Sequence, residues 1–145
     1  VFSAAVTGTQ ALTFSGTGAD ATVDTSADIN AMGLTGLVTV NKAGRAVTFS
    51  NDINFNDNTD IQLTAGTLTF SGDVNNASTN SVWTASAGTQ INAAAGQALN
   101  IGDLILYTGT FDKNTATVTI RAGVVPCASG GLTNGNPVCG GVVQD

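Results

Sequence analysis

The chain has 145 residues, with ten Asp, no Glu, no His and four basic residues, which gives a formal net charge of −6 at pH 7. This length suits a single domain. So few positive charges exclude a basic nucleic-acid-binding surface, and the lack of His excludes histidine metal sites and histidine acid–base catalysis. No apolar run reaches the length of a transmembrane helix.

The composition favours strands over helices, because the chain contains 22 Thr, 18 Gly and 14 Asn. Thr suits a pleated surface, whereas Gly, Asn and Asp suit turns. Apolar residues alternate with Thr or Ser in several short segments, which are 11–15, 46–50, 67–71 and 117–121. This period of two indicates half-buried strands joined by tight corners along residues 1–125.

A repeat of ten aligned positions recurs along the chain. The copies are ATVDTSADIN (21–30), RAVTFSNDIN (45–54), GTLTFSGDVN (66–75), INAAAGQALN (91–100) and the weaker ATVTIRAGVV (116–125). They end at Asn30, Asn54, Asn75, Asn100 and Val125, so the intervals are 24, 21, 25 and 25 residues. This period predicts an all-β fold, a short parallel β-helix of about five turns. The alternative is a β-sandwich or jelly roll built from hairpins of similar length.

Stacked turns would place equivalent residues about 4.8 Å apart. The recurring apolar positions would then form a core stack, whose members are Val47, Phe49, Ile53, Leu68, Phe70 and Val74. The Asn that closes four of the five copies would form an amide ladder along the stack.

Three copies carry Asp at the same position, which predicts a column formed by Asp28, Asp52 and Asp73. Like charges at this spacing repel, and a calcium ion bound by their oxygens would relieve the repulsion. In the simpler interpretation the row is solvated, and each carboxylate accepts a hydrogen bond from a nearby corner amide. We therefore expect no cofactor and keep calcium as the alternative.

Two stretches, VNKAGRAVTFSNDIN (40–54) and TDIQLTAGTLTFSGDVN (59–75), resemble the β-helical passengers of secreted bacterial surface proteins of the filamentous-haemagglutinin and autotransporter type. The resemblance covers roughly residues 20–125 and lies in the succession of strand, corner and strand, not in a diagnostic motif. It implies a β-helix at the cell surface with an adhesive role. Those passengers are much longer than this chain.

The final residues 126–145 form a Gly-, Asn- and Pro-rich tail that contains both cysteines, Cys127 and Cys139. Zinc would need four ligands, and redox motifs usually place their cysteines closer together. We therefore expect a structural disulfide, which implies an oxidising compartment and a secreted or cell-surface protein. The chain starts at Val1 and not at Met, which we interpret as a mature chain after removal of an export signal.

Few side chains point to a specific activity. No pair of Asp stands out as a glycosidase pair, so we expect no enzyme. Trp83 and Tyr107 lie outside the repeat copies and are the candidates for a ligand-binding surface. In the simpler interpretation both pack in the core or at its rim. Asn76 begins a glycosylation sequon. Thr-x-Thr pairs, which would suit ice binding, recur at no fixed place in the repeat.

The function predicted from these features is that of a non-enzymatic structural subunit. Copies of the chain would assemble into an extracellular filament or surface layer through strand edges or solenoid ends. The first strand would be donated or stacked in this contact, and its candidate residues are Val1, Phe2, Ala4 and Val6. The alternative is an adhesin-type binding module that recognises a glycan or a host protein. Neither reading involves nucleic acid.

Overall fold

The computed structural model describes residues 7–8, 11–24, 33–34, 36–55, 58–76, 81–106, 109–120, 132–133, 136–137 and 142–144. Every regular element in these segments is a β-strand. The strands pair in parallel, with a single antiparallel exception among the described pairs. No helix in these segments could cross a membrane.

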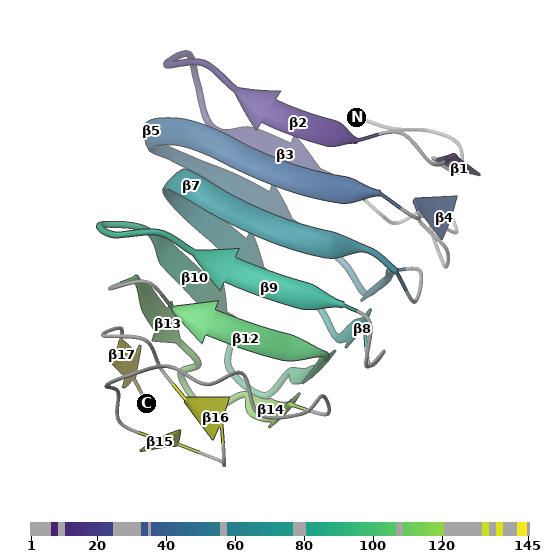
Figure 1. The fold of residues 1–145 in the computed structure, drawn as a ribbon, viewed down its shortest axis with the longest axis vertical. Coiled ribbons are helices and arrows are strands. Elements are labelled where there is room, and N and C mark those ends of the chain that lie inside the picture. The colour runs from purple at the N-terminus through teal and green to yellow at the C-terminus, as the bar shows by residue number, and fades with distance from the viewer. Residues whose placement is uncertain are drawn as a thin grey trace.

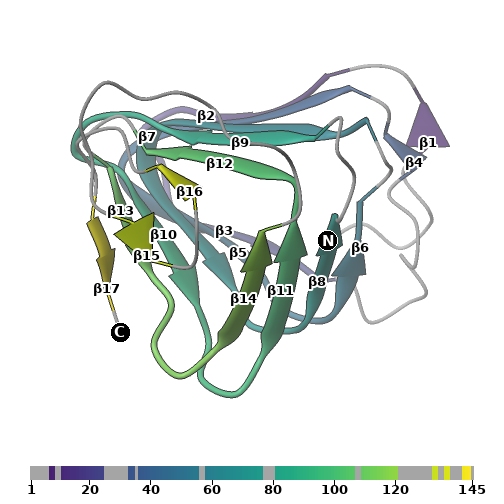
Figure 2. The same ribbon diagram turned by 60° about the horizontal axis from the view of Figure 1, so that its bottom comes forward.

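The strands form three stacks that wind around a common core (Figures 1 and 2). The first stack contains β2 (Leu12–Ser15), the first parts of β5 (Leu37–Phe49) and β7 (Asp60–Phe70), β9 (Val82–Ala85) and β12 (Asp103–Leu106). The second contains β3 (Ala21–Val23), the last parts of β5 and β7, β10 (Gln90–Ala93), β13 (Thr110–Asp112) and β17 (Val142–Gln144).

The third stack contains β6 (Ile53–Asn54), β8 (Val74–Asn76), β11 (Ala98–Ile101) and β14 (Thr117–Ile120). Two further pairs lie outside the three stacks. β1 (Thr7–Gly8) pairs in parallel with β4 (Gly33–Leu34), and β15 (Leu132–Thr133) forms an antiparallel pair with β16 (Asn136–Pro137). The predicted parallel β-solenoid is confirmed, and the sandwich alternative, which requires antiparallel sheets, is wrong. Within the described residues the solenoid has about 4 turns instead of the predicted five, as the 4 strands of the third stack show.

The sequence repeat matches the strand register in the middle of the molecule. Val47 pairs with Leu68, Phe49 with Phe70 and Ile53 with Val74. All six residues of the predicted core stack are at most 1% exposed. The closing Asn residues also follow this register, because Asn75 pairs with both Asn54 and Asn100. Asn30 lies outside the described residues.

The outer copies of the repeat were aligned incorrectly. In the first copy Val23 pairs with Phe49, and in the first half of the fourth copy Ile91 pairs with Leu68, so both are displaced by two residues. The second half of the fourth copy is in the predicted register, because Leu99 pairs with Val74. The fifth copy belongs to another stack, because its Val118 pairs with Leu99. The physical reason is that corners differ in length, which an alignment without gaps cannot represent.

An aromatic stack fills the centre of the core. The rings of Phe49 and Phe70 are stacked with their centroids 5.5 Å apart, and Trp83 continues the stack 5.2 Å from Phe70. Phe55 meets all three rings edge-on, and Phe14 meets Phe49 edge-on at 6.3 Å. Both arrangements are favourable for aromatic pairs. The solenoid is thus held by a column of rings as well as by its backbone ladders.

Candidate functional site: corner carboxylates and solenoid ends

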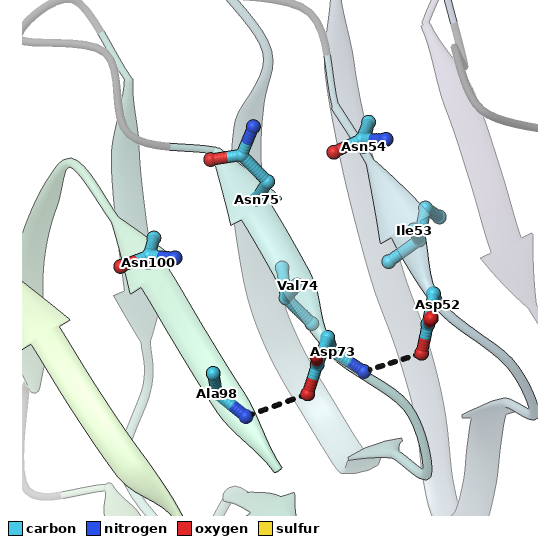
Figure 3. Close-up of a pocket in the computed structure, with 8 residues that line it drawn as sticks. All are labelled: Asp52, Ile53, Asn54, Asp73, Val74, Asn75, Ala98 and Asn100. Atoms are coloured by element: carbon cyan, nitrogen blue, oxygen red, sulfur yellow. Dashed lines mark hydrogen bonds between the residues drawn. The ribbon is translucent and has the colours of Figure 1, made fainter.

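Two of the three aspartates predicted to form a column do lie one above the other. Asp52 and Asp73 occupy the corner where the second stack passes into the third (Figure 3). The backbone N–H of Asp73 donates to Asp52 Oδ1 at 2.8 Å, and that of Ala98 donates to Asp73 Oδ1 at 2.7 Å. The column therefore links successive coils through backbone amides. Asp28 lies outside the described residues.

The other corners use the same device. The N–H of Ala46 donates to Asp20 Oδ1 at 2.9 Å, and the N–H of Val82 donates to Asp60 Oδ1 at 2.8 Å. In each bond the acceptor is an Asp of one coil, and the donor lies in the coil that follows it along the chain. A carboxylate at a corner thus accepts a hydrogen bond from a backbone N–H of the next coil, which satisfies that N–H.

The outer face of the third stack forms a shallow polar groove of about 270 Å³. Asn54, Asn75 and Asn100 lie in register along it, beside Asp52 and Asp73 (Figure 3). Within the described part of the chain, no group of three or more Cys or Asp residues is placed to hold a metal ion. The groove offers amide and carboxylate groups, which can bind hydroxyl-rich ligands by hydrogen bonding.

Trp83 is a core residue, so its assignment to a ligand-binding surface was wrong. Its side chain is 0% exposed, and its Nε1–H donates to Asn76 Oδ1 at 2.6 Å. Asn76 Nδ2 in turn donates to Ser81 Oγ at 3.1 Å, and Asn76 is 1% exposed. The amide of the sequon is therefore buried and engaged in the fold. The other predicted surface aromatic, Tyr107, lies outside the described residues.

We expect Asn76→Ala to destabilise the fold, because it removes the acceptor for the buried indole N–H. A buried donor without a partner costs about 1–3 kcal/mol. Urea unfolding followed by Trp83 fluorescence measures this loss. Asn75→Ala is the matched control, since Asn75 is the exposed neighbour on the same strand and its loss should stay within about 0.5 kcal/mol. Equal losses in the two variants would contradict the assigned hydrogen bond.

At the N-terminal end of the solenoid, β2 and β3 pair on one side only within the described residues, each with β5. Neither strand carries a charged residue. Leu12 and Phe14 pack against the core but stay partly exposed. Lys, Pro and bulges are the usual protection of a strand edge, and β2 and β3 have no Lys or Pro.

At the other end, β12 pairs only with β9 and β14 only with β11 among the described strands. Asp103, the first residue of β12, has a buried Oδ1 without a hydrogen-bond partner, and burial raises the pKa of this carboxyl above 3.8. Asn92 Oδ1 is also buried without a partner, but Asn92 lies inside the second stack, between Thr69 and Asp112. Asp103 is thus the unsatisfied acceptor that belongs to a terminal strand.

Sequence reasoning missed Asp20, Asp60 and Asp103, although a local signal marks them. Each corner Asp either begins a strand or directly precedes one, so an Asp followed by an apolar residue identifies the device. The predicted assembly residues Val1, Phe2, Ala4 and Val6, and the predicted disulfide between Cys127 and Cys139, lie outside the described residues. Comparisons of the chain with protein-family models, curated proteins and solved structures gave no significant match.

Proposed function

We propose that this chain is a non-enzymatic structural subunit that assembles with its own copies, end to end, into an extracellular filament or surface layer. The observation that carries the proposal is the chemistry of the two solenoid ends. Of the strands that end a stack, β2, β3, β14 and β17 contain no charged residue, and each pairs on one side only within the described residues. β12 also ends a stack, and its single charged residue is Asp103. Uncharged strand edges favour pairing with another chain.

The geometry of the solenoid also favours an open assembly. Its strands are parallel and its two ends differ, so a contact between opposite ends of two copies is heterologous. Such a contact can repeat without limit unless the rotation closes a ring. Repeated stacking would extend the parallel ladders and the apolar core from one copy into the next, as neighbouring coils do within one chain.

The arrangement of the carboxylates supports a structural and not a catalytic role. Four carboxylates each accept a hydrogen bond from a backbone N–H of the next coil, and they belong to Asp20, Asp52, Asp60 and Asp73. Asp52 and Asp73 lie together beside the groove of the third stack, whereas Asp20 and Asp60 lie at other corners. The proposal includes export, with the disulfide between Cys127 and Cys139 closing the tail in an oxidising compartment.

A charge on the open edge of β2 should block assembly. We expect Thr13→Lys to prevent fibre formation, because Thr13 is exposed at the middle of this strand and Lys protects strand edges against pairing. Negative-stain electron microscopy and size-exclusion chromatography measure the result. Thr17→Lys is the matched control, since Thr17 is an exposed residue of the following turn with no part in the ladder. Assembly that persists in Thr13→Lys would contradict a contact through β2.

The groove on the third stack favours a second candidate function, an adhesin-type module that binds a glycan. The aligned side chains of Asn54, Asn75 and Asn100 repeat at the strand spacing, and Asp73 lies beside them (Figure 3). Such a row of amides could bind successive sugar hydroxyls. This function predicts a soluble monomer that binds in a glycan screen and loses binding in Asn75→Ala.

A further inference from the structure

We propose that β12 is the receiving edge of the end-to-end contact and that it takes the β2 strand of a second copy, whose Ala11 amide is hydrogen-bonded by Asp103. This inference rests on the proposed function, because it names the two surfaces through which the copies meet. Inside the chain, neighbouring coils are linked by hydrogen bonds from a backbone N–H to a corner Asp of the preceding coil.

The internal pattern defines what Asp103 should do. At the start of the first stack Leu37 pairs with Asp60, and Val82 pairs with Asp103. The two pairs are neighbours in the stack, and the N–H of Val82 donates to Asp60 Oδ1 at 2.8 Å. Asp60 and Asp103 therefore belong to one column, two coils apart. Asp60 accepts the amide of the strand that stacks on it, whereas Asp103 Oδ1 is buried and has no partner.

A buried carboxylate oxygen without a partner has lost its hydration and gained nothing in exchange. One more strand in the same register would supply the missing N–H. The orphaned atom thus marks the position at which a further strand completes the pattern that the fold uses at its other corners.

The β2 strand of a second copy fits this position in both polarity and register. Leu12 pairs with Val38, so the preceding residue, Ala11, lies opposite Leu37. Leu37 in turn pairs with Asp60, which places Ala11 in the column that contains Asp60 and Asp103. Stacked on β12, the Ala11 amide would face Asp103, and Leu12 would follow Leu104 in the inward column. The uncharged β2 strand would then place its apolar side chain at Leu12 on the apolar column of Leu104. The carboxylate of Asp103 would accept a hydrogen bond from the N–H of Ala11.

A hairpin of the tail lies at this end of the solenoid. β16 lies beside β12 in both views, but no pairing between these strands is among the described ladders (Figures 1 and 2). A docking copy would therefore have to displace this hairpin. It would also have to displace β17, because β17 pairs with β13 at the place where β3 of the docking copy would stack. This requirement would make assembly slower than the addition of a strand to a bare edge.

The experiment compares three variants of the full chain. Asp103→Ala removes the acceptor at the end, Asp103→Asn keeps one acceptor oxygen, and Asp60→Ala removes the equivalent acceptor inside the solenoid. The critical concentration for assembly is measured by sedimentation, and the thermal unfolding midpoint is measured on the unassembled protein.

We expect Asp103→Ala to raise the critical concentration about tenfold or more, the effect of losing one hydrogen bond to a charged group. Its unfolding midpoint should not fall, because the lost oxygen has no partner within the chain. Asp103→Asn should assemble close to the level of the natural sequence. Asp60→Ala should lower the unfolding midpoint, because it removes the hydrogen bond from the N–H of Val82 to Asp60 Oδ1 inside the solenoid.

Assembly of Asp103→Ala at the natural concentration would overturn the inference, while the proposed function would stand as long as the natural chain forms fibres. Failure of the natural chain to assemble would overturn the proposed function itself. Hydrogen–deuterium exchange gives a reading that does not depend on the variants. The amides of β2 should gain protection on assembly, and unchanged exchange of these amides would also overturn the inference.

Discussion

Phe70→Asp is expected to unfold the protein. The side chain of Phe70 is 0% exposed and lies between the rings of Phe49 and Trp83. An Asp there would place a carboxylate in an apolar stack and remove the ring contacts at the same time. Each defect is strongly destabilising, and together we expect a loss of about 5 kcal/mol or more. That is comparable to the whole stability of an ordinary domain.

The adjacent Thr69 provides the matched control. Its position pairs with Thr48 and Asn92 on the outer face, and it is partly exposed. Thr69→Asp introduces the same charge one residue away and should cost no more than about 1 kcal/mol. Urea unfolding followed by circular dichroism compares the two variants. If both substitutions had the same small effect, the assignment of Phe70 to the core would be wrong.

Gly66→Ala has the second largest expected effect. Gly66 turns the corner inside β7 with a φ of +91°, and an added Cβ would collide with the backbone carbonyl oxygens of Lys42 and Arg45. These oxygens belong to the corner of β5 between Asn41 and Ala46, and ladders hold β5 directly before and after this corner, which limits its movement. Backbone strain and steric overlap add up, and we expect a loss of about 3–4 kcal/mol.

Gly88→Ala separates these two contributions. Gly88 also has a positive φ, +72°, but an added Cβ would meet no atom within 4 Å. Only the strain of the left-handed conformation remains, and this costs about 1–2 kcal/mol. Thermal and urea unfolding of both variants measure the difference. Similar losses at Gly66 and Gly88 would show that the close approach between the coils at this corner is not rigid.

The solenoid itself could be predicted from the sequence because its physical signal is periodic. Alternation of apolar and polar residues identified the strands, and the repeat identified the stacking of Phe49 on Phe70 and of Ile53 on Val74. The register failed where corners change length. Val74 lies four positions after Phe70, whereas the equivalent Leu99 lies six positions after Ala93. Loop length is a local property that a repeat of fixed length does not reveal.

The roles of single polar residues were harder to predict. The column of Asp52 and Asp73 followed from the repeat, but the amide that each carboxylate accepts depends on the geometry of the corner. The sequence left the place of Trp83 open between the core and a ligand-binding surface, because Trp83 lies outside the ten aligned positions. Its burial depends on Asn76, which satisfies the indole N–H across a corner, and no periodic pattern marks this pair.

The most direct test of the account is the state of assembly of the 145-residue chain with its sequence unchanged. Sedimentation velocity over a wide concentration range, with negative-stain electron microscopy of the same samples, gives the measurement. The account predicts uniform fibres that persist on dilution and a mass that grows with concentration. A monodisperse monomer of 14.4 kDa at high concentration would contradict it, and the groove along Asn54, Asn75 and Asn100 would then become the leading candidate site.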